Sequence, residues 1–533
     1  ILNVTLAGDA TFGSNNGRFD IGRSEGSGLY GTISSTTGNS FTFTKVGSNQ
    51  VTVRGTSTNV YFNIAAGLVD LEDFDAAGGL GVTVQSGAQV GSYGNRNILA
   101  PVTLLNGSTI KSLGGGTQTW SGAFTLGLSA GDVVSVDSSS NNFGILGSIS
   151  GPGKLSLTGT TQFFRLAGNN TFTGGTEIAS GGGLSLESPN ALGAGNLTQT
   201  GGGWIDNLSG TPVTLTTTGT YTLNNNLSFG GTGALDLGVN LTTALTADRT
   251  FTLSGSTLTM SGPVTGSFKV TKTGAGLLVL GGNNTFTGGV GLTGTSGADA
   301  GMIKVTSNTG LGTGAVTSSF NTGAWSSQVQ LSDGITVSNN FTMTGHGRDS
   351  TAAIQNYGNI ASIAGNNTVN GVVTVTSGGG ASVVSASSGA TLNLLGGITT
   401  NAGPRSLSLV GAGTINVGGA GAYDTTGAFQ VGIGVLGASN ASNNIKMADA
   451  VNGTVAAGVT VVPQTNTSGM AVGQTVFSAT GVSLGTITAL TANTNFTLSA
   501  ATSAALVFAD FSMASSAGCF SPSTAAQSRS CVP

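Results

Sequence analysis

The feature that most limits how this chain can fold is a short segment, residues 270–289, in which strand and turn signals alternate every few residues. Gly274–Gly276 predicts a turn, because glycine adopts positive φ at little steric cost. Leu277–Leu280 is an apolar run of strand length, and Gly282–Asn284 predicts a second turn. Thr285–Thr287 combines β-branched and aromatic residues and predicts the start of another strand. Since the turns are too closely spaced for a helix, the segment predicts short β-strands joined by corners.

The same pattern recurs along the chain, which identifies it as a repeat protein. In a repeat protein each unit buries its apolar face against its neighbours, because a single unit cannot bury that face alone. The segment that follows one copy, residues 184–198, also matches the segment that follows another, residues 303–317. The further copies are a degenerate first half at 44–55, a close copy at 151–157 with 168–175, and a weaker copy at 365–371.

These segments resemble the autotransporter-associated β-strand repeat, which occurs in passenger domains of bacterial autotransporters and in related surface proteins. The family pattern is roughly Thr-Lys-x-Gly-x-Gly-x-Leu-x-Leu, then Gly-x-Asn-x-Tyr/Phe-x-Gly-Gly, then Ala-Leu-Gly-x-Gly, and residues 148–200 and 264–318 match it best. The resemblance implies an all-β fold, a right-handed parallel β-solenoid (β-helix), secreted and displayed at the cell surface. It brings no catalytic residues. The expected inward-facing side chains are Leu155, Leu157, Phe172, Leu278, Leu280 and Phe286.

Changes in local composition divide the chain into three predicted parts. Residues 1–437 are predicted to form the solenoid, and a linker rich in asparagine and serine follows. Residues 438–513 resemble a small all-β module of phage-tail and bacterial surface proteins. Residues 514–533 are a tail that contains the two cysteines of the chain. We expect Cys519 and Cys531 to form a disulfide in an oxidising, extracellular compartment.

Composition and charge exclude several classes of protein. Among 533 residues there are 92 glycines, 16 lysines and arginines, and 20 aspartates and glutamates. A hydrophobic share of 38% is enough to build a core and argues against disorder. The net charge of −4 is scattered without a basic stripe, so we expect no nucleic-acid partner. No apolar run reaches the roughly 20 residues of a spanning helix, and the chain is predicted not to span a membrane.

Two groups of residues are candidates for chemistry. Asp70, Glu72, Asp73 and Asp75 form the densest acidic cluster, and their oxygens are weak candidates for binding calcium. A solvated corner is the simpler interpretation of this cluster, and no other cofactor is expected. Residues 346–349, His-Gly-Arg-Asp, could act in catalysis, but a glycine-bounded surface loop explains them equally well.

Asparagine pairs and tryptophans allow either binding or structural roles. Asn169–Asn170 and Asn283–Asn284 could bind carbohydrate through their amides. We favour a structural role for them, because asparagine suits left-handed corners and hydrogen-bonded ladders. Trp120, Trp204 and Trp325 could stack against sugar rings if exposed, but we favour packing.

The function that these features favour is mechanical. We predict a secreted structural β-solenoid, not an enzyme, that assembles with copies of itself into extracellular fibres or a surface coat. Its first strand has an edge that could pair with another copy through Ile1, Leu2, Val4 and Leu6. Two alternatives stay open. One is a cleaved autotransporter passenger that acts as an adhesin on a cell surface or on glycans, and the other is a polysaccharide-degrading β-helix enzyme.

Overall fold

The computed structural model of this protein is all-β, as the sequence predicts. The chain forms two compact units, residues 1–268 and residues 269–533, which are described separately below. Within the part of the chain that the structure describes, no helix is long and apolar enough to cross a membrane. The described residues are 3–22, 31–73, 76–77, 80–159, 162–293, 301–319, 327–345, 347, 358–376, 382–400, 405–411, 413–417, 429–434, 445–447, 449–450, 454–455, 458, 460–463, 472, 475–477, 483–491, 494–500, 506–507 and 510–514.

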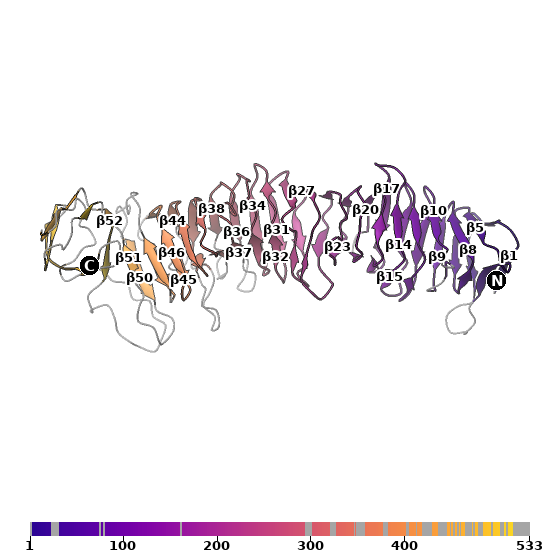
Figure 1. Ribbon diagram of the computed structural model, residues 1–533, viewed down its shortest axis with the longest axis horizontal. Helices are drawn as coiled ribbons and strands as arrows, with labels where there is room; N and C mark the ends of the chain where they lie inside the picture. Colours follow the sequence, from indigo (N-terminus) through magenta and orange to yellow (C-terminus); the bar gives the residue numbers. More distant parts are fainter. Residues whose placement is uncertain are drawn as a thin grey trace. The chain divides into compact units, whose positions relative to one another are not determined.

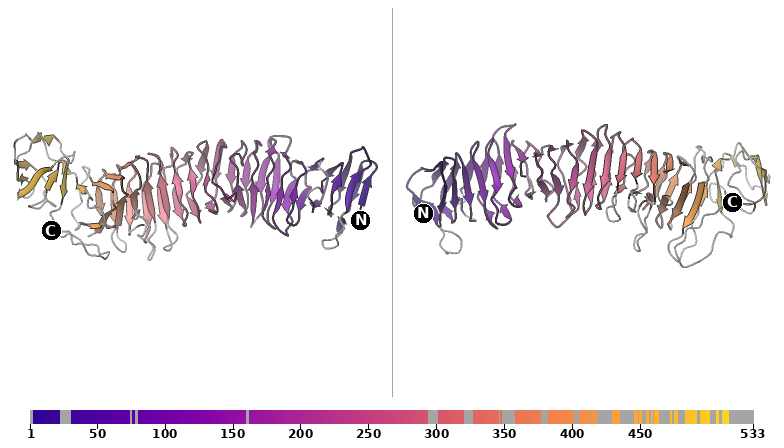
Figure 2. Two further views of the ribbon diagram at one scale, coloured as in Figure 1. Left: turned by 60° about the horizontal axis from the view of Figure 1, so that its bottom comes forward. Right: turned by 180° about the vertical axis from the view of Figure 1, so that it is seen from behind.

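In residues 1–268 each strand pairs in parallel with a strand of the next turn, so this unit winds as a β-solenoid. Figure 1 shows the strands as a stack of short arrows, and Figure 2 shows the same stack from two further sides. Sheet A contains β1 (Asn3–Leu6), β4 (Thr32–Ser35) and β7 (Ser57–Thr58). Sheet B contains β2 (Ala10–Gly13), β5 (Phe41–Val46), β8 (Val60–Ile64), β10 (Val82–Val84), β13 (Val102–Leu104), β16 (Phe124–Leu126) and β19 (Ile149–Ser150).

Three further sheets complete this unit. Sheet C contains β3 (Arg18–Ile21), β6 (Gln50–Val53), β9 (Leu68–Leu71), β11 (Gln89–Ser92), β14 (Thr109–Ser112), β17 (Val133–Asp137), β20 (Lys154–Leu157), β22 (Thr176–Ile178), β24 (Leu197–Gln199), β27 (Gly219–Leu223), β30 (Leu241–Leu245) and β33 (Val264–Thr265). Sheet D contains β12 (Asn97–Ile98), β15 (Gln118–Trp120), β18 (Phe143–Ile145), β21 (Phe163–Leu166), β23 (Gly183–Leu186), β25 (Trp204–Asp206), β28 (Leu227–Phe229) and β31 (Arg249–Leu253). Sheet E contains β26 (Val213–Thr214), β29 (Leu235–Asp236) and β32 (Leu258–Met260).

The register of the sheets places equivalent residues of successive turns above one another. Val82 pairs with Val102, 20 residues further on, and Val102 pairs with Phe124, 22 residues further on. Successive side chains of a strand point to opposite faces, so the apolar residues of each strand line the interior and its threonines face outward. The six side chains predicted to face inward are at most 1% exposed, which confirms that prediction: Leu155, Leu157, Phe172, Leu278, Leu280 and Phe286.

Equivalent corners of the two clearest repeats require glycine. Gly175 and Gly289 have φ of +85° and +82°, in the left-handed region that L side chains rarely adopt. A Cβ atom on Gly175 would lie 2.5 Å from the carbonyl oxygen of Asn196, and one on Gly289 would lie 2.3 Å from that of Ala315. The Gly-Gly end of the repeat motif therefore lets the backbone of the next turn approach closely.

In residues 269–533 the strands as far as β51 also pair in parallel. One sheet contains β34 (Val270–Thr273), β36 (Val290–Thr293), β38 (Val316–Ser319), β41 (Phe341–Thr344), β44 (Val373–Thr376) and β47 (Ile398–Thr400). A second contains β35 (Leu278–Leu280), β37 (Met302–Val305), β39 (Gln328–Leu331), β42 (Ile360–Ser362), β45 (Ser382–Ala386), β48 (Arg405–Val410) and β50 (Phe429–Gly434). A third contains β40 (Thr336–Val337), β43 (Asn366–Val369), β46 (Thr391–Leu394), β49 (Thr414–Val417) and β51 (Ile445–Met447).

The pairing changes to antiparallel after β51. The sequence places the end of the solenoid at residue 437, and this three-part division of the chain stays a prediction, as does the right-handed sense of the coil. The antiparallel strands are β52 (Asp449–Ala450), β53 (Thr454–Val455), β54 (Val461–Pro463), β55 (Thr475–Phe477), β56 (Ser483–Thr491), β57 (Asn495–Leu498), β58 (Leu506–Val507) and β59 (Asp510–Ala514).

Candidate functional site

Two residues of the acidic cluster found in the sequence are not part of a solvated corner, because Asp70 is only 1% exposed and Glu72 only 5%. Asp70 lies on β9, and Glu72 is the first residue after the end of that strand. Arg18 Nη2 lies 3.3 Å from Glu72 Oε1, and Arg54 Nη1 lies 3.2 Å from Glu72 Oε2. Both arginines also contact Asp20, at 2.6 and 3.5 Å. The cluster is an ion-pair network that links the turns containing β3, β6 and β9.

The surroundings of Asp70 favour its protonated form. Its Oδ2 atom accepts hydrogen bonds from Gln50 Nε2 at 3.1 Å and from Thr52 Oγ1 at 3.4 Å. Burial raises the pKa of Asp70 to about 8, and the charge of Glu72 and a hydrogen bond to it act in the same direction. Among the described residues, no group of three or more His, Cys, Asp or Glu side chains could hold a metal ion. Calcium binding by a set that includes Asp75, which lies outside those residues, stays a prediction.

The second asparagine of each Gly-Asn-Asn motif is a structural anchor. Asn170 is 4% exposed. Its Oδ1 accepts a hydrogen bond from the Ile149 backbone N–H of the preceding turn at 2.9 Å, and its Nδ2 donates to the Ala191 carbonyl of the following turn at 2.7 Å. Asn284 is 1% exposed and donates from Nδ2 to the Gly310 carbonyl at 2.6 Å. The structural interpretation fits these residues, since each amide joins successive turns.

Neither of these two asparagines has the positive φ of a left-handed corner, so that part of the interpretation is wrong. A ladder does occur in residues 269–533, where Asn393 Nδ2 donates to Asn366 Oδ1 at 2.6 Å and Asn416 Nδ2 donates to Asn393 Oδ1 at 2.7 Å. The weaker copy of the motif at 365–371 contains the whole of strand β43, so its asparagine pair lies on a strand and only Gly365 before the pair has positive φ.

Two of the three tryptophans lie in the described part of the chain, and they differ in burial. Trp120 is fully buried and packs edge-on against Phe124 with ring centroids 5.9 Å apart, as predicted. Trp204 is only half-buried. It occupies an outward position on β25, because its neighbour Ile205 is fully buried in the interior. Trp204 therefore lies at the surface, where it packs against Phe163, and Trp325 lies outside the described residues.

Trp204 and Phe163 form an aromatic pair on the outer face of sheet D. Phe163 lies on β21 and Trp204 on β25, with Gly183 of β23 between them in the register. Their ring centroids are 5.3 Å apart with an interplanar angle of 90°. A Cβ atom on Gly183 would lie 2.5 Å from a ring carbon of Phe163 and 2.6 Å from Trp204 Nε1. The absence of a side chain at Gly183 therefore allows the two rings to meet.

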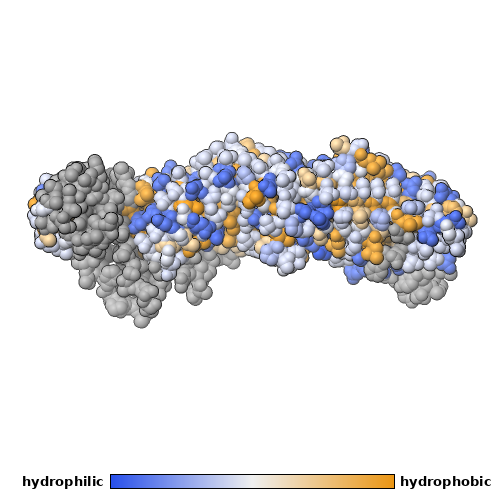
Figure 3. All heavy atoms as spheres, in the orientation of Figure 1, coloured by the Kyte–Doolittle hydropathy of each residue, from blue (hydrophilic) through white to orange (hydrophobic). Residues whose placement is uncertain are grey.

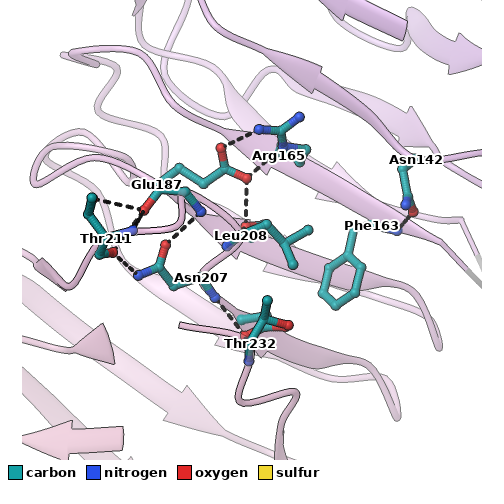
Figure 4. A network of polar contacts seen from close by, with 11 residues as sticks. Asn142, Phe163, Arg165, Glu187, Asn207, Leu208, Thr211 and Thr232 are labelled. Carbon is teal, nitrogen blue, oxygen red and sulfur yellow. Dashed lines mark hydrogen bonds and ion pairs between the residues drawn. The ribbon is translucent and has the colours of Figure 1, made fainter. Parts of the chain in front are cut away.

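A network of hydrogen bonds and one ion pair borders this aromatic pair. Arg165, two residues after Phe163, lies with Nε 2.6 Å from Glu187 Oε1 and Nη2 2.8 Å from Glu187 Oε2. Ser185 Oγ donates to Glu187 Oε1 at 2.9 Å and accepts from the Leu208 N–H at 3.0 Å. Figure 4 shows Arg165 and Glu187 facing each other across neighbouring strands, with the Phe163 ring nearby. The Arg165 side chain stays 26% exposed, whereas that of Glu187 is 4% exposed.

Asp206 and Asn207 complete the network on the side of Trp204. Asp206 accepts hydrogen bonds from Thr232 N at 3.0 Å and from Thr232 Oγ1 at 2.7 Å. Asn207 Nδ2 donates to the carbonyls of Thr211 at 2.7 Å and Ala234 at 2.8 Å, which holds the corner after β25 (Figure 4). We call the six residues Phe163, Arg165, Ser185, Glu187, Trp204 and Asp206 the sheet D patch.

Sequence reasoning missed two lysines that face the interior. Lys45 and Lys272, each in a Thr-Lys segment that precedes a glycine corner, are both 0% exposed. Lys45 Nζ donates to three backbone carbonyls at 2.8 to 3.0 Å, and Lys272 Nζ donates to those of Thr273 and Gly274 at 2.6 and 2.7 Å. Burial lowers the pKa of Lys272 to about 7. The Thr-Lys-x-Gly part of the motif is the signal that could have found them.

Exposed apolar side chains are scattered over the surface. In residues 1–268 the large apolar side chains described as exposed are Tyr61, Tyr93, Leu99, Leu128 and Val239. None of them belongs to the sheet D patch. Figure 3 likewise shows hydrophobic residues in separate areas between hydrophilic ones on the face in view.

The remaining sequence candidates are placed as follows. Leu6 is 4% exposed and half-buried Val4 lies beside it on β1, so Leu6 belongs to the interior of the first turn. Asp73 accepts a backbone hydrogen bond from Ala76 and closes a turn. Pairing of copies through the first strand, and the disulfide of the tail, stay predictions. The candidates outside the described residues are Ile1, Leu2, Asp75, His346, Arg348, Asp349, Cys519 and Cys531.

Comparison with known proteins shows similarity to an adhesin. The chain is 30% identical over 307 residues to a curated relative, the Adhesin BmaC autotransporter of Brucella suis biovar 1 (strain 1330). The match covers 54% of this chain but 8% of that relative, so the chain spans only a small part of the relative's length. No family model and no solved structure matches the chain. The resemblance to the β-strand repeat family therefore stays a prediction, while the β-solenoid that it implies is confirmed.

Proposed function

We propose that this chain is part of the passenger of a cell-surface adhesin and lies outside the cell. The observation that carries the proposal is the similarity to a relative named as an autotransporter adhesin, found in a chain that folds as a β-solenoid. This function replaces the self-assembling fibre as our preferred interpretation, because the relative is named as an adhesin.

The solenoid suits adhesion because the inward side chains that form its core are separate from the outward side chains that a ligand can contact. Inward positions are filled by apolar residues such as Leu155 and Leu157, which leaves the outward positions free to vary without loss of the core. Outward residues of successive turns stand about 4.8 Å apart and form long, flat columns. A ligand can therefore contact several turns at once.

A polysaccharide-degrading enzyme is less well supported. Hydrolysis of a glycosidic bond normally needs two carboxyl groups roughly 5 to 10 Å apart, one of which transfers a proton. On sheet D the carboxylates of Glu187 and Asp206 are both engaged by neighbouring donors. Glu72 is likewise held by two arginines. These groups serve the structure in the arrangement observed.

The proposal is tested by adherence of beads coated with the full chain. We expect the coated beads to bind cultured mammalian epithelial cells more than albumin-coated beads do, and we expect free chain to compete with them. The proposal fails if the coated beads bind no more than albumin-coated beads. It also fails if excess free chain leaves their binding unchanged.

A further inference from the structure

We propose that the sheet D patch binds a neutral sugar ring of a glycan or polysaccharide, with Phe163 and Trp204 as the stacking surface. This inference rests on the proposed adhesin function and names the ligand class of one site. It starts from the position of the two rings. Both occupy outward positions, both are half-buried, and part of each side chain therefore faces solvent.

The aromatic pair is not explained by packing of the core. The inward residues of the same strands, Phe164 and Ile205, are already fully buried. Outward positions further along the same column carry small polar residues, with Ser228 beneath Trp204 and Thr252 beneath Ser228. Placing two large rings in such a column leaves apolar surface in water, which costs free energy that a ligand would recover.

The polar groups beside the rings are held in fixed positions. Arg165 carries five N–H donors, of which those at Nε and Nη2 contact Glu187, and its side chain is 26% exposed. Glu187 is in turn held by Ser185. Because these side chains already hold one another through hydrogen bonds without a ligand, we expect little side-chain entropy to be lost when a hydroxyl group binds.

The chemistry of the patch matches a sugar better than a protein surface. A pyranose ring has an apolar C–H face that stacks on an aromatic ring and an edge of hydroxyl groups that exchange hydrogen bonds with charged side chains. The partly exposed Arg165 is paired with Glu187, and the further carboxyl group of the patch, on Asp206, is buried against Thr232. No unpaired positive charge of the patch therefore faces an anionic sugar, and a neutral sugar is favoured. A stable protein interface buries about 800 Å² on each partner around an apolar centre. The exposed apolar side chains that could widen this patch, such as Tyr93 and Leu128, lie on other sheets or corners.

The inference is tested by titrating the full chain with neutral oligosaccharides. The probes are the hexaoses of cellulose, chitin, laminarin and amylose, as models of polysaccharides, and high-mannose N-glycans, as models of host glycans. Binding is measured by calorimetry and by tryptophan fluorescence. We expect at least one probe to bind, and the two sets of probes separate the two sources of ligand.

Three variants locate the binding at the patch. Trp204→Ala and Phe163→Ala should each weaken binding about five- to tenfold by removing one ring. Gly183→Ala keeps both rings but pushes them apart, since its Cβ atom would meet ring atoms of both side chains. It should weaken binding to a similar extent while the circular dichroism spectrum is unchanged. Tyr93→Ala is the matched control, because Tyr93 is an exposed aromatic residue outside the patch.

The outcomes separate this inference from the adhesin proposal. The inference is overturned if none of the probes binds, or if the patch variants bind the sugar as tightly as the native chain. It is also overturned if Trp204→Ala abolishes bead adherence that no sugar inhibits, since the patch would then bind a protein. Sugar binding lost in Trp204→Ala, with no adherence to cells by any form, would support the sugar site and count against the adhesin.

Discussion

Replacement of Asn170 by alanine should destabilise the turns around it far more than replacement of its neighbour Asn169. The Asn170 amide satisfies one buried group in each adjacent turn, the Ile149 N–H and the Ala191 carbonyl. An unpaired buried polar group costs about 1–3 kcal/mol, so leaving both groups unpaired should cost about 2–6 kcal/mol. Asn169 is exposed and its side chain accepts a hydrogen bond from exposed Asn190, so Asn169→Ala should cost less than about 0.5 kcal/mol.

The effect is best measured locally. A stack of repeats can open in parts, so a single unfolding midpoint need not report on one turn. Native-state hydrogen exchange of the Ile149 amide measures the stability of this turn directly, because the Ile149 N–H loses its acceptor in Asn170→Ala. A loss of 2 kcal/mol or more corresponds to exchange about 30-fold faster or more. The Val82 amide, bonded to the Pro101 carbonyl in the same unit, is the reference that should not change.

Two results would refute this reasoning. Equal protection of the Ile149 amide in Asn170→Ala and in the native chain would show that the side chain does not join the turns. Equal losses in Asn169→Ala and Asn170→Ala would show that the motif acts through its backbone conformation, not through the buried amide.

Three further predictions concern charge and covalent structure. Between about pH 4 and pH 8 the folded chain keeps a proton on Asp70 that the unfolded chain releases, so the free energy of unfolding should fall as pH rises through this range. Asp70→Asn should remove that slope and be more stable than the native chain at pH 9 in thermal unfolding; an unchanged slope would contradict this. Leu280→Asp should lower the free energy of unfolding, measured in urea, by at least about 3 kcal/mol, because it places a charge in the interior. The outward substitution Val279→Asp should lower it much less, and similar losses for the two variants would show that the register is wrong. Mass spectrometry after alkylation without reductant should find Cys519 and Cys531 joined, and two alkylated thiols would exclude the disulfide.

The repeat motif allowed the interior of the solenoid to be predicted from residues alone. Leu278 and Leu280 alternate with outward Val279, and both are fully buried. This worked because strand side chains alternate strictly between two faces and because glycine corners set the ends of each strand. The same local reasoning failed for Glu72, a buried carboxylate that is paired with Arg18 and Arg54 from earlier turns of the chain. No local pattern shows which distant charges will meet a carboxylate.

The sheet D patch was beyond prediction for the same reason. Phe163, Gly183 and Trp204 are about 20 residues apart, and only the register of parallel pairing brings them into one column. A shift of one residue in any turn would send the same aromatic side chain to the interior. The aromatic residues and the glycine can be found in the sequence, but the lengths of the corners that align them cannot be predicted from it.

The sequence by itself determined that this protein is built from short strands and glycine corners, and that such strands must stack to bury their apolar faces. Those are local properties, set by side-chain alternation and by backbone freedom at glycine. Only the tertiary structure decided which outward residues became neighbours: that Trp204 meets Phe163 over Gly183, and that Asn170 joins three turns. The physical reason is that neighbours across a solenoid are set by the sum of strand and corner lengths in each turn, and these lengths vary from turn to turn.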